Sequence, residues 1–376
     1  MANTLTNLIP DIYSALDVVS RELVGFIPAV SVNAQDNGVA LNENLHIPIT
    51  GAGVGIDIVP TMTVPNPADQ TITSAVVTIT KSRAYEFGII GEEQLGLNKG
   101  VGYQYVQRDM IAQAIRGLVN EVETDIAATY IGASRAYGTA GTTPFATNLS
   151  DPAQVRKILD DNGAPLTDRS LVINTAAGAQ MRTIAQLTKA NEAGTASLLN
   201  QGTLLEIHGF KIRESAKVKT TTKGTGSAYV TNGTFAVGAT TIAVQTGTGT
   251  IIAGDVITFA GDSNKYLVTT ALSAGNLTIA EPGLQQALGT GVAVTVGNNY
   301  TANMAFSRNS ILLVARPPAR PQAGDLALES MMVTDPLSGL SMEFSVYPGW
   351  RKLRYEVALA WGVKLIKPEH CAILLG

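Results

Sequence analysis

The sequence NKGVGYQYVQRDMIAQAIRGLVNEVETDIAATYI, residues 98–131, predicts one helix of unusual length. Its apolar side chains recur at three- and four-residue intervals and so share one face, which is made of Val101, Tyr105, Ile111, Ala114, Ile115, Leu118, Val119, Val122, Ile126 and Tyr130. Asn98 is expected to cap the start of this helix, and Gly132 to mark its end. At about 1.5 Å per residue the helix would measure roughly 45 Å, well beyond the usual globular length. Such a helix in a chain otherwise rich in strand-like runs predicts an α+β protein with a structural spine.

The composition excludes a single small domain and favours a chain that covers its surface with partner chains. A length of 376 residues suggests two or three compact units. Apolar residues make up 45% of the chain and charged residues only 15%, yet no run approaches the ~20 apolar residues of a membrane span. Apolar patches left in water drive association. A compact, slightly apolar enzyme stays open as an alternative at this point.

Charge and cysteine content narrow the function classes further. The net charge of −4 gives no footprint for sequence-independent binding of nucleic acid, so any such contact is local or indirect. Cys371 is the only cysteine, which excludes an intramolecular disulfide and fits a reducing cytoplasm. No basic segment precedes Leu5, so the start is not a signal peptide. Residues 5–23 instead predict an amphipathic helix that ends near Gly25.

Two extended runs within residues 46–93 predict a long two-stranded ribbon. The loop between them is marked by three prolines, Pro60, Pro65 and Pro67. An isolated ribbon is marginally stable, so this one should lie on another surface. The glycine-rich GAGVG at 51–55 does not predict phosphate binding, because the β-like IDIVP follows it where a helix would be needed.

Residues 150–218 predict a compact α+β unit of helix, strand, helix and hairpin. Ser150 begins the first helix and Gly163 ends it, SLVI at 170–173 is a short buried strand, Asn174 caps a helix through Leu187, and Leu204–Val218 is a hairpin that turns at His208-Gly209. Further on, MAFSRNSILLVAR at 304–316 predicts one buried strand, and residues 355–361 and 363–366 predict two closing runs.

Between these parts the composition changes abruptly. From Gly224 to Gly297 the only charged residues are Asp255, Asp262, Lys265 and Glu281. Short alternating strands separated by turns recur, as in TIIAGDVITFAGDSNKYLVTT at 250–270. This pattern is typical of a small all-β barrel or sandwich. Because one α+β unit flanks the β module on both sides, we interpret the module as an insertion.

The chain offers little catalytic chemistry. His46, His208 and His370 each lack a second ligand at metal spacing, so we expect solvated or locally hydrogen-bonded histidines. Three acidic residues of the long helix are expected on a solvated or subunit-facing side, namely Glu121, Glu123 and Asp125. Core or interface anchoring is expected for Trp350 and Trp361. We therefore predict no catalytic residue, no cofactor and no metal site: the sequence favours an assembly protein that is not an enzyme.

The order of these parts resembles the major capsid (coat) proteins of tailed bacteriophages, which have the Hong Kong 97-type fold. YEVALAWGVKLIKPEHCAILLG at 355–376 is similar to the closing strands of that family, LVINTAAGAQMR at 171–182 to its strand-to-helix step, and HGFKIRESAKV at 208–218 to the hairpin that follows. MAFSRNSILLVARP at 304–317 resembles the strand after the inserted β-barrel in coat proteins of short-tailed Salmonella phages. The likeness covers essentially the whole chain and depends on the order of the parts.

The resemblance implies a division of the chain into five parts. They are an N-terminal arm at 1–37, an E-loop ribbon at 38–80, a peripheral domain with the spine helix at 81–132 joined by 325–350, an axial domain at 133–223 and 300–376, and an inserted β-barrel domain at 224–299.

The implied function is that of a structural capsid protein of the virion. Such chains self-assemble in the host bacterial cytoplasm into hexamers and pentamers of an icosahedral shell that encloses packaged double-stranded DNA. The implied partners are other copies, a separate scaffolding protein, a portal protein, DNA held by non-specific contact and a decoration protein, with no membrane. Some relatives crosslink through a ribbon lysine, but residues 45–80 contain none and Lys81 lies only at the base, which puts crosslinking in doubt.

Six charged residues are candidates for contacts between subunits. Arg83 and Glu86 lie at the ribbon base, Glu92 and Glu93 beside the spine, and Arg351 and Arg354 near the closing strands. Ordinary solvated charges are the alternative at each position. For the chain as a whole, the alternatives are an encapsulin-like bacterial compartment and a cytosolic hydrolase with a β-sandwich module, which would need a pocket with paired carboxylates.

Overall fold

The computed structural model describes residues 22–35, 37–50, 55, 57–60, 62, 72–98, 103–146, 148–188, 206–321 and 324–376. The predicted helix at 5–23 and most of the GAGVG segment lie outside these residues. Among the described helices, none is both long and apolar enough to cross a membrane.

The predicted spine helix is present, and its described part begins at Tyr103. Helix α3 (Tyr103–Ala127) continues into the 3-10 turn η3 (Ala128–Gly132), so Gly132 does mark the end. Asn98 is not the expected cap, because it is the last residue of another helix, α2 (Gly91–Asn98). Residues 99–102 lie outside the described part of the chain. The predicted apolar face is buried from Ile111 to Ile126, whereas Tyr105 is exposed.

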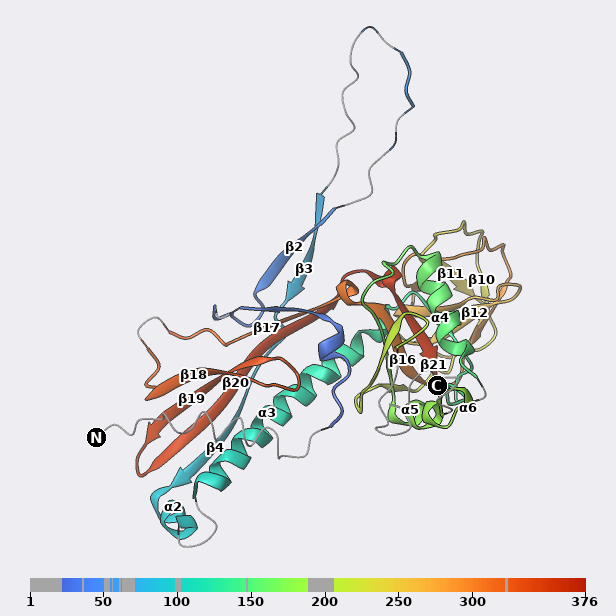
Figure 1. Cartoon of the computed structure of the whole chain (residues 1–376). Helices are drawn as coiled ribbons and strands as arrows, with labels where there is room; N and C mark the ends of the chain where they lie inside the picture. The colour runs from blue at the N-terminus through green and yellow to red at the C-terminus, as the bar shows by residue number, and fades with distance from the viewer. Residues whose placement is uncertain are drawn as a thin grey trace.

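One face of α3 lies along a six-stranded sheet, which we call the spine sheet (Figure 1). Its strands are β1 (Ser31–Ala34), β4 (Lys81–Ile90), β17 (Ile311–Arg316), β18 (Glu329–Thr334), β19 (Ser341–Gly349) and β20 (Lys352–Leu365). The order is β1-β17-β20-β19-β18, and β4 pairs with the other edge of β20. β1 runs parallel to β17, and the other pairs are antiparallel.

Strand β20 corrects the expectation of two closing runs. It continues without a break through Gly362. A Cβ atom at Gly362 would lie 2.1 Å from the carbonyl oxygen of Thr78, so only glycine lets the base of the ribbon cross the strand here. Gly362, which separates the two apolar runs in the sequence, therefore marks the point where the ribbon base crosses β20 of the same chain. It does not mark the end of a strand.

A second sheet, which we call the body sheet, contains the C-terminus. Its strands are β5 (Arg135–Tyr137), β6 (Arg169–Ile173), β7 (Glu206–Ile207), β8 (Phe210–Glu214), β16 (Tyr300–Ser307) and β21 (Cys371–Leu375), with β9 (Thr220–Thr221) beside β16. Helices α4 (Ser150–Asp161), α5 (Thr175–Arg182) and α6 (Ala185–Thr188) belong to the same region. The buried strand β6 and the hairpin turn at His208-Gly209 confirm the predictions for this unit.

Two details of the body sheet refine those predictions. The Asn174 side chain accepts a hydrogen bond from the Ala177 amide at 2.9 Å, which confirms the predicted cap. The helix that it caps does not run unbroken to Leu187, because it ends at Arg182 and resumes at Ala185. The Thr183 hydroxyl donates to the backbone oxygen of Gln180 at 2.6 Å at this break.

The run at 304–316 is two strands in two different sheets, where one strand was expected. β16 ends at Ser307 in the body sheet, the 3-10 turn η4 (Arg308–Ser310) follows, and β17 continues in the spine sheet. The turn is fixed by the Ser310 hydroxyl, which donates to the Ser307 oxygen at 2.7 Å. β17, β18, β19 and β20 therefore lie in the spine sheet, whereas β16 and β21 lie in the body sheet.

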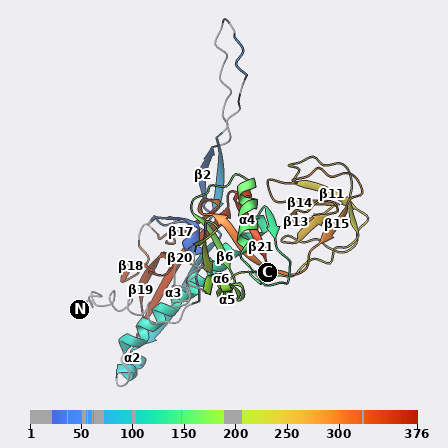
Figure 2. The same cartoon turned by 45° about the vertical axis from the view of Figure 1, so that its right-hand side comes forward.

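The inserted β module is a closed barrel, as the strand pattern predicted. Its six strands are β10 (Tyr229–Thr231), β11 (Thr241–Gln245), β12 (Val256–Phe259), β13 (Lys265–Ser273), β14 (Asn276–Ile279) and β15 (Ala293–Val296). They pair in the order β12-β15-β10-β11-β14-β13, and β12 with β13 closes the circle. The barrel has a core of its own and stands beside the body sheet (Figure 2).

The barrel is joined to the body sheet by strand pairing as well as by the chain. β13 pairs antiparallel with β5, with Tyr266 opposite Arg135. The Arg135 guanidinium donates to the Asn264 side chain at 3.0 Å across this junction and to the Asn162 side chain at 3.1 Å. The Tyr300 hydroxyl donates to the Gly254 oxygen at 2.6 Å. The insertion is therefore a continuation of the body sheet.

The ribbon consists of β2 (Asn44–Thr50) paired antiparallel with β3 (Ile72–Thr78), and it projects from the rest of the chain (Figure 1). Among the described residues of the ribbon, those at its base are covered by the same chain. There Val77 and Ile79 are buried against residues of β17 and β20, and the Lys364 ammonium donates to the Val76 oxygen at 2.8 Å. The predicted ribbon is confirmed, and its supporting surface within the subunit is the end of the spine sheet.

Candidate assembly interface

The outer part of the ribbon exposes large apolar side chains far from any described core. Ile58 is 98% exposed and Met62 is fully exposed, and Val59 and Ile72 are also exposed. Scattered exposed apolar residues are ordinary on a protein surface, but a group on one projecting segment marks a surface for association. These side chains make the ribbon the strongest candidate for a contact with another molecule.

A second exposed group lies at the end of the spine sheet that is farthest from the barrel, where α2 follows β4 (Figure 1). Trp350 is 91% exposed in the turn between β19 and β20, and the Arg351 guanidinium lies 5.8 Å from its ring centroid. The Gly91 amide donates to the Arg351 oxygen at 3.4 Å, which holds this turn beside α2. Ile90 and Leu95 are exposed nearby in the chain. We call this group the tip.

Trp350 and Trp361 have opposite environments. Trp361 of β20 is fully buried, and its Nε1 donates to Asp125 Oδ2 of α3 at 2.8 Å. The Asp125 Oδ1 atom accepts a hydrogen bond from the Lys81 ammonium at 2.8 Å. Lys81 also lies 5.8 Å from the Trp361 ring centroid. Lys81 is thus engaged within its own subunit.

Of the six predicted contact residues, Arg83 binds within the chain. Its guanidinium donates to Glu121 at 3.2 and 3.3 Å, and the Tyr85 hydroxyl donates to the same carboxylate at 2.8 Å. The hydrogen bond to Glu121 raises the pKa of Arg83 and helps to hold the pKa of Glu121 below its usual value against burial. This cluster holds β4 against α3.

Glu86 and Arg354 also pair within the chain. Glu86 on β4 stands directly opposite Glu356 on β20, so two carboxylates face each other across the strands. The Arg354 guanidinium contacts Glu86 and lies 3.0 Å from Glu356, which offsets their repulsion. The structure therefore brings these two predicted residues together, but in one subunit.

The other three predicted residues lie at the tip. Glu93 Oε2 accepts a hydrogen bond from the Ile90 amide at 3.1 Å and so caps the start of α2. Glu92 is exposed in the same turn. Arg351 has a φ of 57°, the left-handed region, at the tip turn. The tip therefore carries charges of both signs, and Arg351 lies against the exposed Trp350.

The prediction that the acidic residues of α3 form a solvated or subunit-facing side is wrong. Glu121 and Asp125 bind β4 and β20 as described above. Glu123 is 1% exposed and accepts four hydrogen bonds from its own chain. One signal was present in the sequence, because Glu123 lies four residues after Val119 and three before Ile126, within the apolar stripe.

The grouping and burial of the titratable side chains in the described part of the chain bear on metal binding and on reactivity. No group of three or more histidine, cysteine, aspartate or glutamate side chains there could hold a metal ion. Burial raises the pKa of the Cys371 thiol and lowers the pKa of His370. A buried thiol with a raised pKa is a poor nucleophile, since the thiolate is the reactive form.

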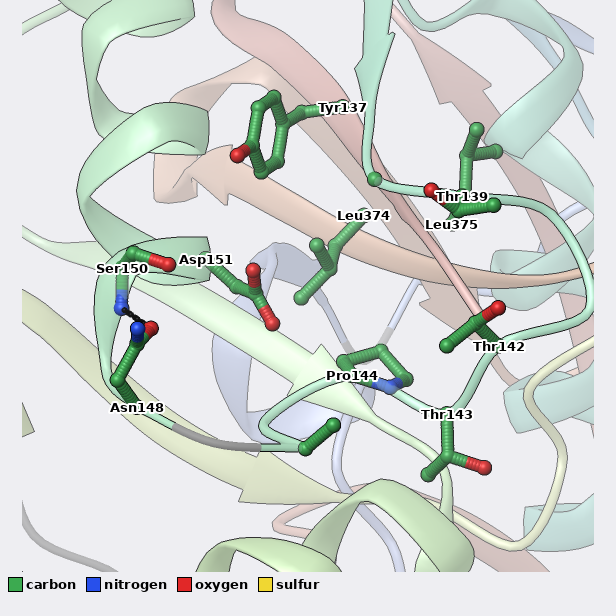
Figure 3. A pocket seen from close by; sticks show the side chains of 12 residues that line it. Tyr137, Thr139, Thr142, Thr143, Pro144, Asn148, Ser150, Asp151, Leu374 and Leu375 are labelled. Carbon is green, nitrogen blue, oxygen red and sulfur yellow. Dashed lines mark hydrogen bonds between the residues drawn. The ribbon is translucent and has the colours of Figure 1, made fainter.

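One open cavity of about 200 Å³ lies between the 137–151 segment and the end of β21 (Figure 3). Asp151 supplies a carboxylate to its lining, and Asp151 Oδ2 accepts a hydrogen bond from the Phe145 amide at 2.8 Å. Asn148 accepts a hydrogen bond from the Ser150 amide at 3.0 Å. Among the described lining residues no second carboxylate stands beside Asp151, so the cavity lacks the pair that a hydrolase of the predicted kind needs.

Comparison with known proteins identifies the fold. No family model matches the sequence, and no curated protein matches it. The capsid structure of the cyanophage P-SCSP1u is similar over 95% of this chain and 89% of that chain, with a TM-score of 0.52 and 12% identity. The chain has the Hong Kong 97-type capsid fold.

Two further solved structures are similar over most of their length. The asymmetric unit of the mature capsid of bacteriophage PhiM1 has a TM-score of 0.48 and 11% identity, over 95% of this chain and 88% of that chain. A chain of Mycobacterium phage Che8 has a TM-score of 0.46 and 13% identity, over 96% of this chain and 90% of that chain.

Proposed function

We propose that this chain is the structural, non-enzymatic major capsid protein of a tailed bacteriophage. It assembles as hexamers and pentamers into an icosahedral shell around packaged double-stranded DNA. The observation that carries this proposal is the capsid fold over 95% of the chain. The ribbon supports it, because its exposed Ile58 and Met62 need a cover that the subunit does not supply.

The ribbon is the main contact to a neighbouring copy. At about 25 cal/mol per Å² of apolar area, a ribbon that hides a few hundred Å² contributes several kcal/mol before the cost of ordering. Such a contact is weak enough for a misplaced subunit to leave. Summed over the many copies of a closed shell, contacts of this size make the shell stable.

The tip is a second contact between copies. Arg351, Glu92 and Glu93 give the tip charges of both signs, so tips of neighbouring subunits complement one another. Arg83, Glu86 and Arg354 are engaged with carboxylates or guanidinium groups of their own subunit. Their contribution to contacts between subunits is therefore smaller.

The parts of the chain take the roles of the capsid subdomains. The arm is 1–37, the E-loop 38–80, and the peripheral domain 81–132 joined by 325–350, to which we add β17 and β20 because they share the spine sheet. The axial domain is 133–223 with 300–376 except for those added strands, and 224–299 is the inserted barrel of the short-tailed Salmonella phage coat type. The closed barrel between β9 and β16 supports this last assignment. Crosslinking through Lys81 is not part of the proposal, because Asp125 binds this lysine.

Assembly of the shell involves further partners. They are a scaffolding protein, a portal protein and a decoration protein, and the packaged DNA is held by non-specific contact. The protein belongs to the virion and assembles in the host bacterial cytoplasm. An encapsulin-like compartment is the second candidate, since the shell fold does not specify the cargo.

Negative-stain microscopy and sedimentation of the expressed chain, with and without a scaffolding protein, test the proposal. The expected result is closed megadalton shells or capsomers. A monodisperse small oligomer under all of these conditions would contradict it. Nuclease-protected DNA in particles purified from the native host separates the phage capsid from a compartment that stores protein.

A further inference from the structure

The two sheets meet at a junction that is filled by residues 22–30, which we call the anchor segment. Phe26, Ile27 and Val30 are fully buried there, among side chains of α3, β16 and the spine sheet. The Phe26 ring stacks on Phe306 of β16, with centroids 6.4 Å apart and planes 9° from parallel. The anchor segment is therefore part of the core of its own subunit.

Gly25 lets the anchor segment pass between α3 and the end of β8. A Cβ atom there would lie 2.6 Å from the carbonyl oxygen of Glu214 and 3.0 Å from a methyl group of Val172. On the same side, the Ala216 amide donates to the Leu23 oxygen at 3.3 Å. The segment thus contacts the backbone of the body sheet on one side and the long helix on the other.

The Glu123 carboxylate connects all three elements at this point. Its Oε1 atom accepts hydrogen bonds from the Gly25 and Phe26 amides at 2.7 and 2.8 Å and from the Ser215 hydroxyl at 2.7 Å. Its Oε2 atom accepts one from the Ile27 amide at 3.0 Å. A buried carboxylate needs several such donors to offset the loss of water. None of the four donors belongs to α3.

A second acidic residue fixes the start of the anchor segment. Glu22 accepts two hydrogen bonds from the Arg116 guanidinium, at 2.7 and 2.8 Å, and one from Asn120 at 2.8 Å. Arg116, Asn120 and Glu123 follow one another at intervals of four and three residues on α3, so they lie on one helix face. This face holds the anchor segment over consecutive turns.

We propose that Glu123 is a three-way latch that locks α3, the anchor segment and the end of β8 into one rigid body. The angle between the spine sheet and the body sheet is then set inside the isolated subunit. This device does not depend on the proposed function, because it would operate in the subunit whether or not shells form.

Amide hydrogen exchange on the full-length chain tests the latch. In Glu123→Gln the side-chain amide turns a donor toward backbone amides that also donate, so the hydrogen bonds cannot all form. The expected result is that the Gly25, Phe26 and Ile27 amides exchange more than about tenfold faster than in the unmodified chain. The matched control is Glu121→Gln on the same helix, for which exchange at these amides stays unchanged.

Ser215→Ala separates the two sides of the latch. It removes the hydroxyl that joins Glu123 to the body sheet and that accepts from the Lys217 amide at 3.1 Å. Faster exchange at Lys217, with continued protection at Gly25 to Ile27, is expected. If Glu123→Gln does not fold, Glu123→Asp carries the test, since an acid shorter by about 1.5 Å cannot reach all the donors. Unchanged protection of the anchor amides in the folded Glu123 variant would overturn the proposal.

Discussion

The ribbon and the barrel both project from the two central sheets, but they differ in how their strands are paired and how their apolar side chains are covered. The barrel closes its six strands through β12 and β13 and buries Tyr266 and Phe259 inside. The ribbon has two strands, and beyond its base it exposes Ile58 and Met62. A closed appendage carries its own core, whereas an open one depends on a cover from elsewhere. Changes to the two should therefore have opposite consequences for the isolated subunit and for its assembly.

The largest expected effect on the isolated subunit is in the barrel core. Phe259 is 2% exposed and packs against Tyr266 with ring centroids 5.7 Å apart. Phe259→Ala should lower the free energy of unfolding of the barrel by about 3–5 kcal/mol, because it removes buried area and leaves a cavity. Calorimetry or denaturant unfolding of the subunit would measure it. A loss below about 1 kcal/mol would contradict the view that the barrel is stabilised by a core of its own.

The barrel should also be sensitive to alkaline pH. Burial, and then the hydrogen bond to Asp262, raise the pKa of Tyr266 above its usual 10.0, so the folded state holds this proton more tightly than the unfolded state. The stabilisation is complete below pH 10 and is lost as the pH rises from 10 toward the folded pKa.

Tyr266→Phe separates the contribution of Tyr266 to this pH dependence from the contributions of other tyrosines. It should cost about 1–2 kcal/mol at neutral pH, because the Asp262 carboxylate and the Gln285 amide lose their partner. It should also flatten the fall in stability above pH 10. Denaturant unfolding at several pH values would measure both effects, and an equally steep fall in the variant would contradict the assignment. β2 and β3 contain no tyrosine, so the ribbon strands add nothing to this pH dependence.

At the ribbon base a smaller effect is expected. Lys364→Met keeps the apolar stem of the side chain but removes the donor to the Val76 oxygen. The exposed position limits the cost to about 0.5–1 kcal/mol. Hydrogen exchange in β3 should rise while exchange in the barrel strands stays the same, and a change in the barrel would show that the two appendages are coupled.

The outer part of the ribbon should give the smallest effect on the isolated subunit. The double variant Ile58→Ser and Met62→Ser should change the free energy of unfolding by less than about 0.5 kcal/mol, because both side chains are already in water. The same variant should reduce the yield of closed particles, measured by sedimentation and microscopy. Normal particle yield would show that the apolar ribbon surface is not a contact between copies.

Local periodicity predicted the elements whose pattern lies within one continuous segment of the chain. The stripe from Ile111 to Ile126 predicted α3, and the short alternating strands between Gly224 and Gly297 predicted the barrel. The family resemblance supplied the order of the parts, which no single pattern contains. What the sequence did not contain is the pairing of distant segments. MAFSRNSILLVAR contains two apolar runs on either side of the polar SRNS, and the two runs lie in different sheets. A buried strand shows the same pattern in either sheet, so the pattern does not say which sheet each run joins.

The candidate site was predictable only by position. Arg354 and Glu86 were expected near an interface, but their cross-strand register makes them partners in one subunit. Register depends on where β4 begins relative to β20, and separate strand patterns do not fix it. Glu123 could have been found from its place in the apolar stripe. Its donors could not, because three of them are backbone amides of the anchor segment, which the sequence does not distinguish.

The pairing of β13 with β5 has a practical consequence for engineering. Because backbone hydrogen bonds fix the barrel to the body sheet, a peptide inserted in a barrel turn would be carried at a constant orientation. The turn at Gly261 has room for such a graft, since no atom lies within 4 Å of a Cβ built there, provided that Gly261 itself, whose φ is 88°, is kept. A loop grafted at this turn would keep one pose relative to the body sheet of its own subunit.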